Sequence, residues 1–117
     1  MDGIPFYQRL AKDAYEHGAN GFVVGCTATE ELAVIRGIIG EDRLILAPGL
    51  GPQGGDASLA IKLGSNSRGE GLLVSSSRSV NYAYEVMGWS WDRFPEASAY
   101  QAKKSRDELN RFRASKN

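Results

Sequence analysis

The stretch LILAPGLGPQGGD, residues 44–56, decides the fold of this chain. Its first four residues are a continuous apolar run of the kind found in a buried strand. Four glycines follow within residues 49–55, and Asp56 then stands where a helix over residues 57–63 needs an N-cap. The order of strand, glycine-rich loop and helix predicts one unit of a parallel α/β fold.

Two more strands are predicted at the spacing of such units. Residues 21–25 (GFVVG) and residues 72–75 (LLVS) are short apolar runs, and both are predicted as buried strands. Phe22 precedes Leu44 by 22 residues and Leu44 precedes Leu72 by 28, a spacing typical of parallel strands joined by right-handed helical crossovers. We therefore predict an α/β fold with three parallel strands in the element order αβαβαβα.

Local signals place the helices around these strands. A first helix, opened by Pro5 and ended by Gly18, has Phe6, Leu10 and His17 at helical spacing, with either Ala14 or Asp13 on the same face. A second begins at the capping box of Thr27 and Glu30, ends at Gly40, and has this apolar face: Leu32, Ile35 and Ile39. Another begins near Arg78 and contains Val80, Tyr82, Ala83 and Val86. Residues 94–117 are predicted as a terminal helix with a frayed tail.

Composition limits the class of protein. The 117 residues suit one small domain, 1–117. Fourteen Lys and Arg balance fourteen Asp and Glu without a basic run, which argues against a nucleic-acid partner. No apolar stretch approaches the roughly 20 residues that cross a bilayer, and the first five residues lack a secretory signal, so we expect a cytoplasmic protein with no membrane partner. The lone cysteine, Cys26, excludes an internal disulfide.

The glycine-rich loop is the first candidate binding site, because ligands of parallel α/β folds bind at the carboxyl ends of the strands. Glycines let backbone N–H groups approach an anion closely, and the N-terminus of the following helix favours negative charge. The amide of Gln53 offers two donors and an acceptor to the same ligand. The loop therefore predicts a phosphate site, with a plain glycine turn as the alternative.

The second candidate follows the next predicted strand, at residues 75–79 (SSSRS). Arg78 can hold a phosphate bidentately, while the backbone N–H groups of Ser77 and Arg78 complete the cradle. Taken alone, this segment is more typical of a surface arginine after a serine-rich helix cap. Two such loops on neighbouring strands favour phosphate binding.

Other chemistries have weaker support. Residues 49–54 also match G-x-G-x-x-G, and residues 76–78 would suit NADP, but the acidic residue expected roughly 20 positions later is missing and the following helix is short. Cys26 follows a strand, yet His17, the single histidine, has no evident reason to activate it, so we expect a buried thiol. No cluster of His or Cys has the spacing of a metal site.

Several motifs resemble one enzyme family. Residues 48–55 (PGLGPQGG) resemble the P-G-x-G-x-Q-G-G loop of the orotidine 5′-phosphate decarboxylases, and residues 76–80 (SSRSV) resemble the S-S-R-x-[IV] segment of their longer bacterial branch. Residues 25–27 (GCT) and 30–32 (EEL) resemble the family's G-A-T…E-E-L stretch, with Cys26 in place of alanine. The resemblance covers most of residues 21–84.

This resemblance implies a partial (β/α)₈ TIM barrel in which the three strands correspond to the sixth to eighth units. It implies a phosphate-binding, carboxyl-terminal part of the enzyme that converts orotidylate to uridylate in pyrimidine biosynthesis, with no metal or organic cofactor. Gln53 would contact the phosphate and the pyrimidine, and Arg78 with the backbone at Ser77 would hold the phosphate. The implied substrate-binding residues are Pro48, Gly49, Gly51, Gln53, Gly54, Ser77 and Arg78.

The catalytic part of the family pattern is absent. The family decarboxylates with a Lys and Asp array that includes Asp-x-Lys-x-x-Asp, and no lysine here has aspartates at those positions. We therefore predict no catalytic residue and an inactive isolated chain that binds orotidylate or uridylate through the phosphate. Three strands cannot close a barrel, so we expect self-association or pairing with a missing amino-terminal half. A related sugar-phosphate barrel enzyme and a non-catalytic nucleotide-binding or interaction module are the alternatives.

Overall fold

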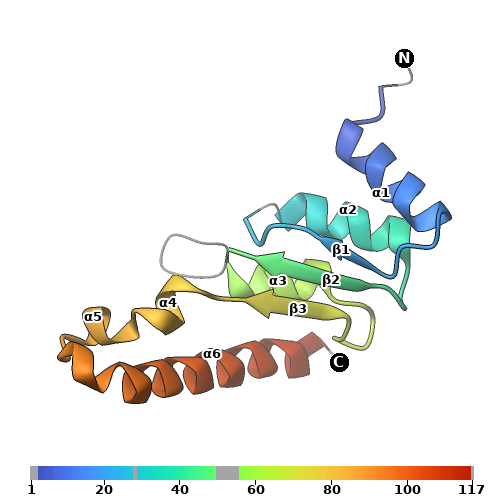
Figure 1. The fold of residues 1–117 in the computed structure, drawn as a ribbon. Helices are drawn as coiled ribbons and strands as arrows, with labels where there is room; N and C mark the ends of the chain where they lie inside the picture. The colour runs from blue at the N-terminus through green and yellow to red at the C-terminus, as the bar shows by residue number, and fades with distance from the viewer. Residues whose placement is uncertain (1–2, 28, 50–55, 117) are drawn as a thin grey trace.

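The computed structural model describes residues 3–27, 29–49 and 56–116. Its elements alternate in the predicted order (Figure 1). They are α1 (Phe6–Glu16), β1 (Gly21–Val23), α2 (Thr29–Ile39), β2 (Leu44–Pro48), α3 (Ala57–Gly64), β3 (Leu72–Ser75), α4 (Arg78–Asn81), α5 (Ala83–Met87), the 3₁₀ turn η1 (Trp91–Arg93) and α6 (Phe94–Lys116).

The three strands form one parallel sheet in the order β1-β2-β3. In its register, Leu46 of β2 lies between Val23 of β1 and Leu73 of β3. Strands that are consecutive in the chain are neighbours in the sheet, as crossovers through α2 and α3 require. The prediction of three parallel strands in an α/β fold is confirmed.

The core lies between the sheet and the helices on one of its faces, where α2 and α3 pack (Figure 1). Ile45 and Ala47 of β2 are fully buried there, together with Leu32 and Ile39 of α2. The apolar face predicted for the second helix is therefore confirmed. Full burial of a leucine or isoleucine side chain, such as Leu32, Ile39 or Ile45, stabilises the fold by about 1.5–3 kcal/mol.

The opposite face of the sheet is open, as expected for three strands that cannot close a barrel, so the prediction of buried strands holds for only one of the two faces. Val23, Leu46 and Leu73 are 72%, 41% and 55% exposed. Side chains alternate between the two faces of a strand, and helices cover only one face here. A continuous apolar run is typical of a strand covered on both faces. Within the described ranges, nothing covers the second face.

The first helix packs through a different stripe from the predicted one. Phe6 is 77% exposed and Leu10 is also exposed, whereas Ala11 is buried and Tyr7 packs against the core. Because α1 meets α2 through this neighbouring stripe, helical spacing alone did not identify the buried face.

The helix predicted from Arg78 is divided in two. Tyr82, with φ −113° and ψ 24°, separates α4 from α5. The terminal helix α6 begins at Phe94 as predicted, and Pro95 lies in its first turn, where a missing N–H costs no helical hydrogen bond.

Two helix caps were predicted from sequence. Asp56 caps α3 as expected, because its Oδ1 accepts the backbone N–H of Leu59 at 3.1 Å. Residue 28, at the start of α2, lies outside the described residues, so the capping box of Thr27 and Glu30 stays a prediction.

Candidate functional site

The carboxyl ends of the three strands lie in a row. Cys26, just after β1, donates its backbone N–H to the carbonyl oxygen of Pro48 at 2.7 Å. Pro48 is in turn aligned with Ser75 at the end of β3. The segments that follow β1, β2 and β3 therefore leave the sheet at one edge, which is where both predicted phosphate loops begin.

The Cys26 side chain secures the start of the glycine-rich loop. Its Sγ donates a hydrogen bond to the carbonyl oxygen of Ala47 at 3.0 Å, and the side chain is fully buried in the core. Burial raises the pKa of the Cys26 thiol, so the sulfur keeps the proton that it donates. The interpretation of Cys26 as a buried thiol is confirmed.

Gly49 allows the chain to turn out of β2. Its φ of +104° lies in the region that favours glycine, and an added Cβ would contact the backbone nitrogen of Cys26 at 3.8 Å. Three of the predicted ligand-binding residues, Gly51, Gln53 and Gly54, lie outside the described residues and stay predictions.

The N-terminus of α3 carries its own carboxylate. Asp56, the predicted N-cap, accepts the backbone N–H of Leu59, so this N–H is not available to a bound anion. A negative charge at this position weakens the favourable field that we expected a phosphate to meet there. The prediction of a phosphate site therefore rests less on this helix terminus than on the glycine-rich loop and Arg78.

Ser77 and Arg78 lie exposed where β3 leads into α4. The hydroxyl groups of Ser76 and Ser79 hydrogen-bond to each other across this turn, and the N–H of Asn81 binds the carbonyl oxygen of Ser77 at 2.8 Å. Among the residues that the structure describes, the Arg78 guanidinium has no hydrogen bond or ion pair. It is therefore available to an anion at the sheet edge.

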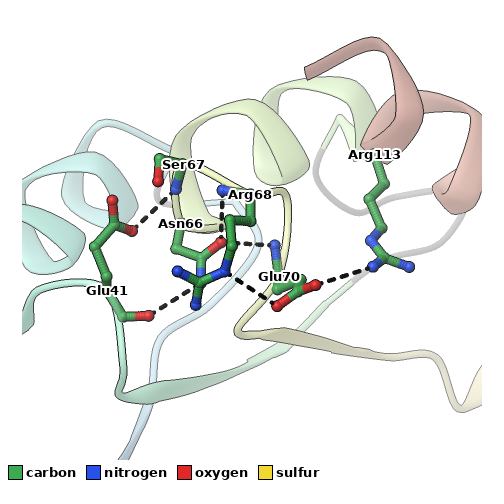
Figure 2. Close-up of polar contacts among 6 residues, drawn as sticks. All are labelled: Glu41, Asn66, Ser67, Arg68, Glu70 and Arg113. Carbon is green, nitrogen blue, oxygen red and sulfur yellow. Dashed lines mark hydrogen bonds and ion pairs between the residues drawn. The ribbon is translucent and has the colours of Figure 1, made fainter. Parts of the chain in front are cut away.

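A polar network occupies the opposite end of the sheet, in the loops that precede β2 and β3 (Figure 2). Oε2 of Glu41 accepts the backbone N–H of Ser67 at 2.9 Å, and Nδ2 of Asn66 donates to the Glu41 carbonyl oxygen at 3.0 Å. The Ser67 N–H is the main reason that the pKa of Glu41 is lowered. These contacts hold the two loops together.

The same network reaches the terminal helix (Figure 2). Oδ1 of the buried Asn66 accepts the N–H groups of Arg68 and Glu70, each at 2.9 Å. The Glu70 carboxylate lies 3.5 Å from both Arg68 and Arg113 of α6. Since the amino ends of barrel strands support stability and the carboxyl ends carry ligands, we assign this network a structural role.

Sequence reasoning missed a buried arginine. The guanidinium of Arg36 on α2 donates to four backbone carbonyl oxygens: Gly64 at 2.8 Å, Gly40 at 3.0 Å, Arg43 at 2.7 Å and Gly71 at 2.9 Å. Burial lowers the pKa of Arg36, while the nearby Glu41 charge opposes that change.

A sequence signal for this arginine existed. Arg36 follows Ile35 and falls four residues after Leu32 and three before Ile39, on the apolar stripe of the helix. A charged side chain at a core-facing position indicates that it has hydrogen-bonding partners inside the fold, because an unpaired buried charge is costly.

Within residues 3–27, 29–49 and 56–116, no group of three or more His, Cys, Asp or Glu side chains is placed to hold a metal ion. In the same ranges, no helix has the length and apolarity needed to cross a membrane.

The parallel strands, their helical crossovers and the row of carboxyl-terminal loops define a part of a (β/α)₈ barrel. The sequence relatives show which proteins of this fold class the chain resembles. The chain is 40% identical to orotidine 5′-phosphate decarboxylase of Cellvibrio japonicus over 97% of its own length, and 39% identical to that of Ralstonia pickettii over 96%. It spans 41% of the length of each of these relatives. No family model matches the chain.

Solved structures agree with the sequence relatives. A structure provisionally assigned as orotidine-monophosphate-decarboxylase of Toxoplasma gondii matches with a TM-score of 0.80 and 28% identity, over 99% of this chain and 44% of that one. The resemblance to the orotidine 5′-phosphate decarboxylases is confirmed: this chain matches about two fifths of the length of those proteins, and its three strands form part of a barrel.

Proposed function

We propose that this chain is the carboxyl-terminal, phosphate-binding part of an orotidine 5′-phosphate decarboxylase, with strands equivalent to the sixth to eighth of the barrel. The observation that carries this proposal is the alignment of Cys26, Pro48 and Ser75 at the carboxyl ends of the three strands. Because of this alignment, the glycine-rich loop and the turn that holds Arg78 begin at the same end of the sheet. Similarity to enzymes of that name supports the choice of ligand. We place the protein in the cytoplasm.

The proposed ligand is orotidylate or uridylate. Arg78 and the Ser77 backbone bind its phosphate together with the glycine-rich loop, in which Gly49 follows Pro48. Gln53 donates to the phosphate and reaches the pyrimidine with its remaining hydrogen-bonding groups. None of these contacts requires a metal or an organic cofactor.

The chain binds without performing the chemistry. Decarboxylation develops negative charge on carbon, which requires a cation positioned to stabilise it. The sequence contains no Asp-x-Lys-x-x-Asp motif to provide that cation in a carboxylate array. Phosphate binding accelerates the reaction only when the reacting groups are held in the same site. Purified chain is therefore expected to show no orotidylate turnover.

Isothermal titration calorimetry with uridylate tests the proposal. Replacing a charged hydrogen-bonding partner weakens binding by about 1.5–3 kcal/mol, so Arg78→Ala is expected to lower affinity roughly tenfold to a hundredfold. Gln53→Ala is expected to weaken binding as well. Arg111→Ala, which removes an exposed arginine on α6, is the matched control and leaves affinity unchanged. Uridylate binding that is absent from wild type or unaffected by Arg78→Ala contradicts the proposal.

A competition experiment distinguishes the proposed function from the closest alternative, a sugar-phosphate barrel enzyme. A decarboxylase-type site recognises the pyrimidine as well as the phosphate, so uridylate should displace a bound probe at much lower concentration than ribose 5-phosphate. Equal competition by both compounds would favour a sugar-phosphate barrel enzyme. If neither compound binds, the result favours the alternative in which the chain is a non-catalytic interaction module.

We also infer that the open face of the sheet is an assembly surface. Val23, Leu46 and Leu73 form an exposed apolar row across all three strands. In the part of the chain that the structure describes, β1 and β3 each have one unpaired edge. Such edges and such a row suit further β/α units that carry apolar strands, and a second copy of the chain is the alternative occupant.

Light scattering after size-exclusion chromatography tests this surface. Wild-type chain alone should self-associate, and adding the non-matching part of the Cellvibrio japonicus relative should convert it to a defined complex. Leu46→Lys places a charge in the centre of the row and should abolish both effects. Val34→Lys, an exposed apolar position on α2, is the control. The inference is contradicted if the wild-type chain is a stable monomer and forms no complex with the added segment.

A further inference from the structure

The terminal helix α6 contacts the turn that carries Arg78. Oγ of Ser98 donates a hydrogen bond to the carbonyl oxygen of Val80 at 2.8 Å. Val80 belongs to α4 and lies two residues after Arg78. Next to Ser98, Ala97 is fully buried, and Ala83 at the start of α5 is buried as well. Small buried residues on both elements let the backbones of α6 and the α4–α5 segment approach closely.

Helix α4 depends on such outside support. It has four residues, and a single helical turn is unstable without tertiary contacts because its nucleation costs more than its few hydrogen bonds return. The Val80 carbonyl oxygen accepts a backbone N–H at the C-terminal end of α4. Ser98 donates a second hydrogen bond to the same oxygen, from a different helix.

Farther along, α6 packs against α3 rather than against the strands. A cavity of about 650 Å³ separates it from β3, with Leu72 and Val74 on one side and Ala102 and Arg106 on the other. The contact at Ser98 is therefore a point at which α6 reaches the carboxyl-terminal edge of the sheet, where the candidate site lies.

We propose that Ser98 is a positioning residue for the phosphate site: through the Val80 carbonyl it holds α4 so that Arg78 and Ser77 stay at the sheet edge beside Pro48 and Gly49. This inference rests on the proposed phosphate binding by Arg78. Ser98 does not touch the ligand itself.

Calorimetric titration of the full chain with uridylate gives the first test. A neutral hydrogen bond contributes about 0.5–1.5 kcal/mol, so Ser98→Ala should weaken uridylate binding about threefold to tenfold. Ser98→Thr keeps the donor and should restore affinity to within about twofold of wild type. Ser115→Ala is the matched control, because Ser115 donates at the same 2.8 Å distance to Phe112 within α6 itself. It should leave affinity unchanged.

A double-mutant cycle tests whether Ser98 acts through Arg78. In the Arg78→Ala background, Ser98→Ala should cause a clearly smaller loss of affinity than in wild type, since the main group that it positions is gone and only the Ser77 backbone remains. A full additional loss in that background, or wild-type affinity in Ser98→Ala, overturns the inference.

Limited tryptic cleavage after Arg78 gives a readout that needs no ligand. Loss of the Ser98 bond should free the turn, so cleavage at Arg78 should be about threefold to tenfold faster in Ser98→Ala than in wild type or Ser115→Ala. Unchanged cleavage overturns the positioning role, whatever uridylate does. Faster cleavage in a chain that does not bind uridylate would support the positioning of α4 and refute the proposed function instead.

Discussion

Nη2 of Arg36 lies 2.9 Å from the carbonyl oxygen of Gly71. This hydrogen bond connects the last turn of α2 to the residue directly before β3, where Gly71 adopts a φ of +81°. Arg36 is only 9% exposed, and the acceptors of its guanidinium among the described residues are backbone carbonyls. One side chain therefore fixes the ends of α2 and α3 and the starts of β2 and β3.

Replacing Arg36 with lysine should destabilise the fold. A lysine ammonium is a compact charge that cannot match the planar fork of a guanidinium, so several buried carbonyl groups lose their donors. We expect Arg36→Lys to lower the free energy of unfolding by about 2–3 kcal/mol, measured by urea denaturation. The exposed Arg111→Lys should stay within about 0.5 kcal/mol of wild type. Equal urea midpoints for the two variants would contradict the role assigned to Arg36.

Replacing each of two helical glycines with alanine should change the stability of the fold in opposite directions. A Cβ at Gly37 meets nothing within 4 Å, so Gly37→Ala should raise stability by about 0.5–1 kcal/mol through helix propensity. A Cβ at Gly64 would lie 3.2 Å from Cδ1 of Leu72 and 3.3 Å from Cδ2 of Leu32. Gly64→Ala should therefore lower stability by about 1–3 kcal/mol, as expected for an overpacked core. Thermal unfolding of both variants checks the pair, and a shift of the same sign in both would count against the packing described for α3.

The Cys26 thiol should be unreactive in the folded protein. It is fully buried, and burial raises its pKa, so at pH 8 both access and the thiolate fraction are reduced. A thiol-specific reagent such as DTNB should label Cys26 at least about a hundredfold more slowly in buffer than in denaturing urea. Rapid labelling in buffer would mean that the start of the glycine-rich loop opens readily.

The hydrogen bond between Glu41 and Ser67 should make stability depend on pH. The Ser67 N–H favours the ionised carboxylate and lowers the pKa of Glu41 in the folded state. A lowered folded-state pKa adds stability that is complete above the ordinary value of 4.5 and is lost as the pH falls through the lower folded value. Wild type should therefore exceed Glu41→Gln in stability at pH 7, and the difference should shrink between pH 4.5 and pH 3 in urea titrations. A difference that is constant over this range would exclude the ionised contact.

The glycine-rich loop and the Arg78 turn were recognised from sequence because their signals are local. Pro48, Gly49, Ser77 and Arg78 stand directly after apolar runs, and the carboxyl ends of parallel strands meet at one edge. Their alignment through Cys26 and Ser75 required the register of the sheet, which no local pattern contains. The support of Arg78 by Ser98 also lay beyond sequence reasoning, since 18 residues separate Ser98 from Val80.

The sequence by itself determined the order and type of the elements, because apolar runs, glycines, prolines and the Asp56 cap act through neighbours in the chain. Tertiary structure alone decided which residues are covered. Ile45 and Leu46 are adjacent and chemically alike, yet the first is fully buried and the second is 41% exposed, because the helices pack on one face of the sheet. Arg36 is the converse case: its charge predicts exposure, and only the convergence of carbonyl groups from distant segments provides the hydrogen bonds that allow its burial.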